Sequence, residues 1–181
     1  MDKIFAVANQ KGGVGKTTTS VNLAASLAAT RRRVLLIDLD PQGNATTGSG
    51  VAKNELDLTV YDVMLGDSPA ADVIVSVAGG YDLLPANGDL TAAEVELLDA
   101  PHKEQRLKQA LEPVAAKYDA IVIDCAPSLS MLTLNGLVAA DGVIIPMQCE
   151  YFALEGLAAL TQTIERVAET VNPRLHIAGI L

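Results

Sequence analysis

Three glycines, a lysine and two threonines stand together near the start of the chain, in Gly12-Gly13-Val14-Gly15-Lys16-Thr17-Thr18. Phosphate oxygens need several backbone N–H groups close by, and glycine permits that approach because it has no Cβ. Lys16 is placed to reach the β- and γ-phosphates of a nucleotide, and the Thr17 hydroxyl is placed to bind Mg²⁺. Thr18 is placed to donate a hydrogen bond to a phosphate nearer the ribose. The spacing predicts a loop at residues 11–18 that holds ATP with Mg²⁺.

The loop departs from the usual phosphate-loop pattern at one position. The first glycine of that pattern would stand at position 10, where this chain has Gln10, and an additional cation, Lys11, follows it. A dinucleotide-binding loop is a weaker alternative, because the spacing G-x-G-x-x-G is absent. A glycine-rich turn that binds nothing is another, but it leaves the glycines, lysine and threonines at one strand-to-helix junction unexplained.

Three aspartates follow apolar segments farther along the chain. Asp38 and Asp40 come after the apolar run at 34–37, and Asp124 comes after the run at 120–123. In an open parallel sheet the carboxyl ends of the strands face the ligand crevice. Because residues two apart in extended chain point the same way, we expect Asp38 and Asp40 both to face the phosphates or the metal. Asp124 is expected to contact Mg²⁺ directly or through water.

The elements that must position these residues alternate along the chain. Apolar strand patterns occur at 4–8, 34–37, 81–84, 120–123, 142–146 and 177–181. Helical patterns occur at 17–29, 60–65, 90–98, 104–117 and 154–171. Continuous apolar strands that alternate with helices are typical of a parallel sheet covered on both faces. We predict an α/β fold with a doubly wound, mostly parallel sheet and helices on both faces.

The same pass along the chain indicates one domain over residues 1–181 and no linker. The last residues have the pattern of a strand that enters the sheet, with no turn or polar tail after it. We therefore expect this domain to be truncated at its C-terminus.

Composition narrows the class of protein. Half of the 181 residues are hydrophobic, only 3% are aromatic, and the formal net charge is −9. Such a charge argues against a generally basic nucleic-acid-binding surface. The sequence has no apolar run of 18 residues and no signal-peptide anatomy, so we expect a cytoplasmic protein with no membrane segment. Its two cysteines, Cys125 and Cys149, are expected to be buried and reduced.

Several segments together resemble the ParA/Soj family of chromosome and plasmid partition ATPases. Residues 11–18 resemble the deviant Walker A motif of the wider ParA/MinD class of P-loop NTPases, and residues 38–44 and 123–129 resemble its two carboxylate motifs. Residues 83–87 and 150–157 resemble segments of ParA itself. The similarity runs over essentially the whole chain.

The resemblance implies an ATPase that acts as a switch. In the family, the lysine that matches Lys11 crosses a dimer interface to the partner's nucleotide, so two monomers would enclose two ATP molecules with Gly12 at the close approach. Asp40 would position the attacking water, and Asp124 matches the Walker B aspartate. Hydrolysis would separate the homodimer. The ATP-bound dimer would bind DNA without sequence preference at the nucleoid, and a ParB-type protein would stimulate hydrolysis.

These expectations define three sets of residues. The catalytic set is Lys11, Lys16 and Asp40. The nucleotide-binding set is Lys11, Gly12, Gly13, Val14, Gly15, Lys16, Thr17, Thr18 and Asp38. The Mg²⁺ set is Thr17 and Asp124.

Two alternatives remain open. A MinD-like ATPase that cycles on a membrane to place the division site would need a C-terminal amphipathic helix, which this sequence lacks. A nucleotide-dependent interaction module that scarcely hydrolyses ATP is the second, and the presence of Asp40 argues against it. The family's adenine segment and several of its DNA-binding residues come after position 181. The one basic cluster, Arg31-Arg32-Arg33, follows a helix end, which favours a solvated helix terminus over contact with DNA.

Overall fold

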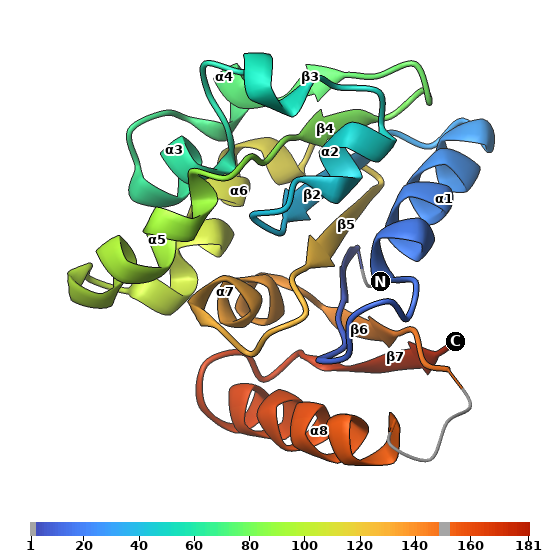
Figure 1. Cartoon of the computed structure of the whole chain (residues 1–181), viewed down its shortest axis with the longest axis vertical. Helices are drawn as coiled ribbons and strands as arrows, with labels where there is room; N and C mark the ends of the chain where they lie inside the picture. Colours follow the sequence, from blue (N-terminus) through green and yellow to red (C-terminus); the bar gives the residue numbers. More distant parts are fainter. Residues whose placement is uncertain (1–2, 149–152) are drawn as a thin grey trace.

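A seven-stranded sheet forms the centre of the structure, a computed structural model that describes residues 3–148 and 153–181 (Figure 1). In spatial order its strands are β3 (Val75–Ser76), β4 (Asp82–Leu84), β2 (Val34–Leu39), β5 (Ala120–Cys125), β1 (Ile4–Val7), β6 (Gly142–Ile145) and β7 (His176–Ile180). Neighbouring strands run parallel except for β3, which pairs antiparallel with β4. The predicted mostly parallel sheet is therefore confirmed.

Helices cover both faces of this sheet. The α-helices are α1 (Lys16–Ala29), α2 (Asn44–Gly48), α3 (Val60–Leu65), α4 (Ala70–Val73), α5 (Leu90–Glu96), α6 (Arg106–Ala115), α7 (Met131–Ala139) and α8 (Ala153–Thr170). Short 3₁₀ helices lie at Lys53–Glu55, Leu97–Asp99 and Lys103–Gln105. One face of the sheet packs against α1 and part of α2, and the other packs against α3, α5, α6, α7 and α8 (Figure 1).

Alternate residues of the central strands explain why the sheet is covered on both sides. In β2, Leu35, Ile37 and Leu39 belong to one apolar cluster, whereas Val34 and Leu36 belong to the other. Every residue of β2 and of β5 is buried. Successive side chains of a strand point to opposite faces, so a continuously apolar strand is stable only when both faces are packed.

The predicted elements are present, with ends that mostly differ by one or two residues. The strands expected at 34–37 and 120–123 extend to Leu39 and Cys125, so Asp38 and Asp124 lie inside β2 and β5. The elements that were not predicted are the helices α2, α4 and α7, strand β3, and the 3₁₀ helix at Lys53–Glu55. Seven of the nine residues of α7 are buried, so its sequence shows no polar face from which a helical period could be read.

Two sequence predictions concern residues outside the described ranges. Cys149 and residues 150–152 are among them, so the burial of Cys149 and the meaning of the 150–157 segment stay predictions. Cys125 is buried, as expected. Within residues 3–148 and 153–181, none of the helices combines the length and apolar character needed to span a bilayer.

Candidate nucleotide-binding site

The candidate site is a cleft at the carboxyl end of β1, where the loop to α1 begins. In the sheet, β1 lies between β5 and β6, and crevices of this kind at the carboxyl ends of strands are where open α/β sheets bind ligands. The cleft has a volume of about 390 Å³. Its lining consists of Gly12, Gly13, Gly15, Lys16, Thr17, Thr18, Asp40, Gln42, Asn44 and Pro127. Most of the predicted phosphate loop thus meets Asp40 in one place.

The loop has the backbone that a phosphate cradle requires. Gly13 and Gly15 have φ values of +74° and +89°, which glycine adopts without strain. A Cβ added at Gly12, Gly13 or Gly15 would meet no other atom within 4 Å, so these glycines border open space. No described side chain caps the N-terminus of α1, which starts at Lys16. Its first N–H groups and the positive end of its dipole are therefore available to an anion in the cleft, which Lys16 and Thr17 also line.

The side chain of Lys16 makes a hydrogen bond across this loop. Its Nζ donates a hydrogen bond to the backbone oxygen of Lys11 at 2.8 Å. The side chain is buried, and this burial lowers the pKa of the Lys16 ammonium, while the nearby carboxylates of Asp124 and Asp40 raise it. The ammonium group is therefore held beside two acids at the base of the predicted phosphate site.

Asp124 has one oxygen with a partner and one without. Ser20 Oγ donates to Oδ1 at 2.8 Å, whereas Oδ2 is buried with no hydrogen-bond partner among the described residues. Burial raises the pKa of Asp124 to about 6, and the hydroxyls of Thr17 and Ser20 oppose that rise. A buried carboxylate oxygen without a partner is unfavourable, and Mg²⁺, which prefers oxygen ligands, would satisfy it. The hydroxyl of Thr17 and the carboxylate of Asp124 thus fit a Mg²⁺ site.

Of the two aspartates expected to face the phosphates or the metal, Asp40 lines the cleft and Asp38 does not. Asp40 lines the cleft, and its Oδ1 accepts a hydrogen bond from the Gln42 N–H at 2.9 Å. Asp38 is fully buried, and its Oδ2 accepts bonds from both the N–H and the hydroxyl of Thr46, each at 2.7 Å. Burial raises the pKa of Asp38 to about 7, although the Thr46 hydroxyl lowers it. Asp38 is therefore held by donors from α2 and is not part of the lining of the cleft.

Lys11 and Val14 belong to the loop, but over the described residues the lining of the cleft includes neither of them. Val14 is buried, and the Lys11 backbone N–H donates to Oδ1 of Asn9 at 3.0 Å. The role of Lys11 across a dimer interface therefore stays a prediction.

Two buried polar residues support the loop and were not predicted. Asn9 accepts the Lys11 N–H, and its Nδ2 donates to the backbone oxygen of Pro146 at 2.7 Å, which ties the loop to the end of β6. Ser20 holds Asp124. Both leave a signal in the sequence: Asn9 directly follows an apolar strand, and Ser20 stands four residues after Lys16, on the same face of the helix.

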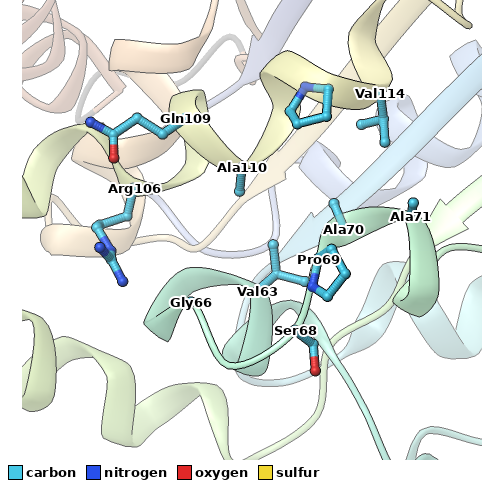
Figure 2. Close-up of a pocket in the computed structure, with 11 residues that line it drawn as sticks. Val63, Gly66, Ser68, Pro69, Ala70, Ala71, Arg106, Gln109, Ala110 and Val114 are labelled. Atoms are coloured by element: carbon cyan, nitrogen blue, oxygen red, sulfur yellow. The ribbon is translucent and has the colours of Figure 1, made fainter.

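A second cavity, of about 420 Å³, lies between α3, α4 and α6 (Figure 2). Its walls are mainly apolar, with Arg106 and Gln109 of α6 at one end. The Arg106 guanidinium donates to the backbone oxygens of Met64, at 2.9 Å, and of Leu65, so it closes the C-terminal end of α3. The described lining of this cavity contains no carboxylate and no phosphate loop, so the nucleotide chemistry belongs to the first cleft.

Known proteins match this chain along nearly its whole length. A family model described as an AAA domain matches residues 2–177. The chain is 53% identical to the chromosome partitioning protein ParA of Myxococcus xanthus over 180 residues, which are 99% of this chain and 64% of that protein. It is 52% identical to the sporulation initiation inhibitor protein Soj of Bacillus subtilis over 182 residues, covering 100% of this chain and 72% of Soj.

A solved structure agrees with this match at the level of the fold. The structure of cobyrinic acid a,c-diamide synthase from Mycobacterium smegmatis with bound ADP and magnesium has a TM-score of 0.97 and 46% identity to this chain. The match covers 100% of this chain and 74% of that one. The chain described here spans between 64% and 74% of the length of these three proteins.

Proposed function

Because the chain belongs to the ParA family of partition ATPases, we propose that it is an ATP-dependent dimerisation switch that hydrolyses ATP slowly and drives chromosome or plasmid partition. The observation that carries this proposal is the convergence of the glycine loop, Lys16 and Asp40 on one cleft, with Asp124 beside Lys16. ADP and magnesium in the M. smegmatis structure support ATP with Mg²⁺ as the ligand here.

Each side chain has a proposed part in the reaction. The loop N–H groups and Lys16 bind the phosphates, and Thr17 and Asp124 hold Mg²⁺, which would neutralise phosphate charge when bound. Asp40, which lines the same cleft, orients the attacking water. Phosphoryl transfer needs mainly positioning and charge neutralisation, so these few groups suffice for slow turnover.

The dimer is proposed from Lys11 and Gly12. Gly12 is exposed and Lys11 is partly exposed, so both are accessible to a second copy of the chain. A lysine that contacts the partner's triphosphate makes a charge-assisted contact that exists only while the γ-phosphate is present. Hydrolysis would remove this contact and separate the two copies.

DNA and a ParB-type stimulating protein are the proposed partners, and nucleoid association follows from DNA binding. With a net charge of −9, a DNA surface would have to be local. Of the basic cluster, Arg33 is paired with Asp119 at 2.9 Å, and Arg31 takes a φ of +64° just after the end of α1. The ion pair with Asp119 supports a structural part for Arg33.

A second candidate function comes from the M. smegmatis structure, whose name describes an amide synthase acting on cobyrinic acid. The 46% identity along the whole chain makes this candidate worth a direct test. It predicts ATP turnover that depends on cobyrinic acid and a nitrogen donor. The partition proposal predicts turnover without either, so phosphate release with and without the two compounds separates the candidates.

The switch is tested by light scattering with Mg·ATP and with Mg·ADP. We expect the molar mass to double with ATP only, and Lys11→Ala to remain monomeric with both nucleotides. Asp40→Ala should remain dimeric with ATP while phosphate release falls by roughly 10²-fold or more, since the water loses its orienting carboxylate. A mass that ignores nucleotide, or wild-type turnover in Asp40→Ala, would contradict the proposal.

A further inference from the structure

The segment that carries Asp40, residues 40–48, is anchored by Thr46. This threonine is fully buried in α2. Its hydroxyl donates to Asp38 Oδ2 at 2.7 Å and accepts the N–H of Ala86 at 2.9 Å. The Ala86 N–H can only donate, so the Thr46 hydroxyl accepts that bond and gives its single proton to Asp38, the carboxylate form of which can only accept.

The loop at residues 85–87 packs against the same segment from the other side. Ala86 is fully buried, and the backbone oxygen of Pro85 accepts the N–H of Val60 at 2.8 Å. Gly43, with a φ of +59°, lies so close that a Cβ there would stand 2.8 Å from the Ala86 oxygen. This loop is part of the 83–87 segment that resembles ParA, for which the proposed ATPase cycle gives no role.

Asp38 links Thr46 to Asp40 by hydrogen bonds. Its Oδ1 accepts the backbone N–H of Asp40 at 3.2 Å. The Asp40 carboxylate then accepts the Gln42 N–H at 2.9 Å, and the Asp40 backbone oxygen accepts the Gly43 N–H at 2.8 Å. The turn that aims Asp40 into the cleft is thus closed at Gly43, which also contacts Ala86.

We propose that Thr46, together with the 85–87 loop, is a positioning residue for the hydrolytic step. Its hydroxyl sets Asp38, and Asp38 sets the turn that presents Asp40. The inference rests on the proposed function, in which Asp40 orients the attacking water. A misplacement of about 1 Å can reduce a rate by about 10²-fold, whereas ATP is bound by a different segment, the 11–18 loop. Turnover and ATP affinity should therefore respond separately.

The test compares Thr46→Val with Thr46→Ser. Valine keeps the branched shape but removes the hydroxyl, which leaves the Ala86 N–H without its acceptor and Asp38 with one donor fewer. We expect Thr46→Val to lower kcat about tenfold or more, while the dissociation constant of a fluorescent ATP analogue changes by less than about threefold. Thr46→Ser retains the hydroxyl and should keep kcat within about threefold of wild type.

Thr47→Val is the matched control. Thr47 is the next residue of α2, its side chain is exposed, and its hydroxyl bonds to the Gly43 backbone oxygen at 3.1 Å. The same chemical change there should leave kcat within about twofold of wild type. If Thr46→Val turns over like wild type, the inference is overturned. It is also overturned if both Thr46 variants lose ATP affinity and turnover together, because that pattern indicates a general structural defect.

Hydrogen exchange keeps this inference separate from the proposed function. The amides of Asp40 and Ala86 should exchange about tenfold faster or more in Thr46→Val than in Thr46→Ser, because both depend on the Thr46 hydroxyl. A wild-type protein that binds ATP without hydrolysing it would contradict the proposed function. The exchange data still test the inference in that case. If the Asp40 amide exchanges equally fast in Thr46→Val and Thr46→Ser, the inference is overturned, and if it exchanges faster in Thr46→Val, the positioning of Asp40 by Thr46 is supported.

Discussion

Asp38 and Asp40 carry the same side chain two positions apart, and their neighbours give them different places in the structure. Extended-chain geometry predicts that both face the phosphates or the metal. Asp40 lines the cleft, whereas Asp38 is fully buried and accepts two hydrogen bonds from Thr46, eight positions after it. That contact is tertiary, so no local pattern around Asp38 indicates it. The loop glycines, Lys16 and Thr17 were easier to predict, because their chemistry depends on spacing within one short segment.

Asp124 offers a test of the electrostatics at this scale. Its folded-state pKa of about 6 lies above the usual unfolded value of about 3.9, so the folded protein binds this proton more tightly. The resulting stability is complete below the unfolded pKa and is lost as pH rises through about 6. In metal-free buffer, we expect the free energy of unfolding of Asp124→Asn, relative to wild type, to rise by on the order of 1 kcal/mol from pH 5 to pH 8.

Urea unfolding in EDTA at several pH values measures this difference. In separate samples without EDTA, Mg·ATP should stabilise the wild type but stabilise the Asn variant much less, because the amide lacks the charge that holds the cation. If the free energies of unfolding of wild type and Asp124→Asn change with pH in the same way, Asp124 is already charged in the folded state at pH 5.

Among the elements, continuous apolar strands were predicted well and α7 was missed. The strands are apolar and the turns around them are polar, so the sequence indicates where each strand lies even where it does not indicate the residue at which the strand ends. Helix α7 is buried on nearly all sides, and Thr133 and Asn135 within it are buried too. Without an exposed polar face, its sequence carries no helical period.

The packing of α7 can be tested through its glycine. A Cβ at Gly136 would lie 3.0 Å from Cys125 Sγ and 3.3 Å from Leu39 Cδ2, so α7 touches β5 and β2 closely there. We expect Gly136→Ala to destabilise the fold by about 1–2 kcal/mol, since overpacking outweighs the helical gain from alanine.

Gly156 in α8 is the matched control, because a Cβ there would meet nothing within 4 Å. Gly156→Ala should stabilise the protein by about 0.5–1 kcal/mol through helix propensity alone. Chemical unfolding of both variants checks the opposite signs. Equal effects from the two substitutions would mean that α7 does not sit tightly on the sheet.

At the scale of the whole molecule, strand order brings the site together. The order β2-β5-β1 puts the phosphate loop and the carboxylates of two other strands at one edge, and Asp38 and Asp124 are register partners across β2 and β5. The sequence indicates that strand ends gather at a common edge. It does not indicate which strands are neighbours, because that choice depends on how distant helices pack against the sheet.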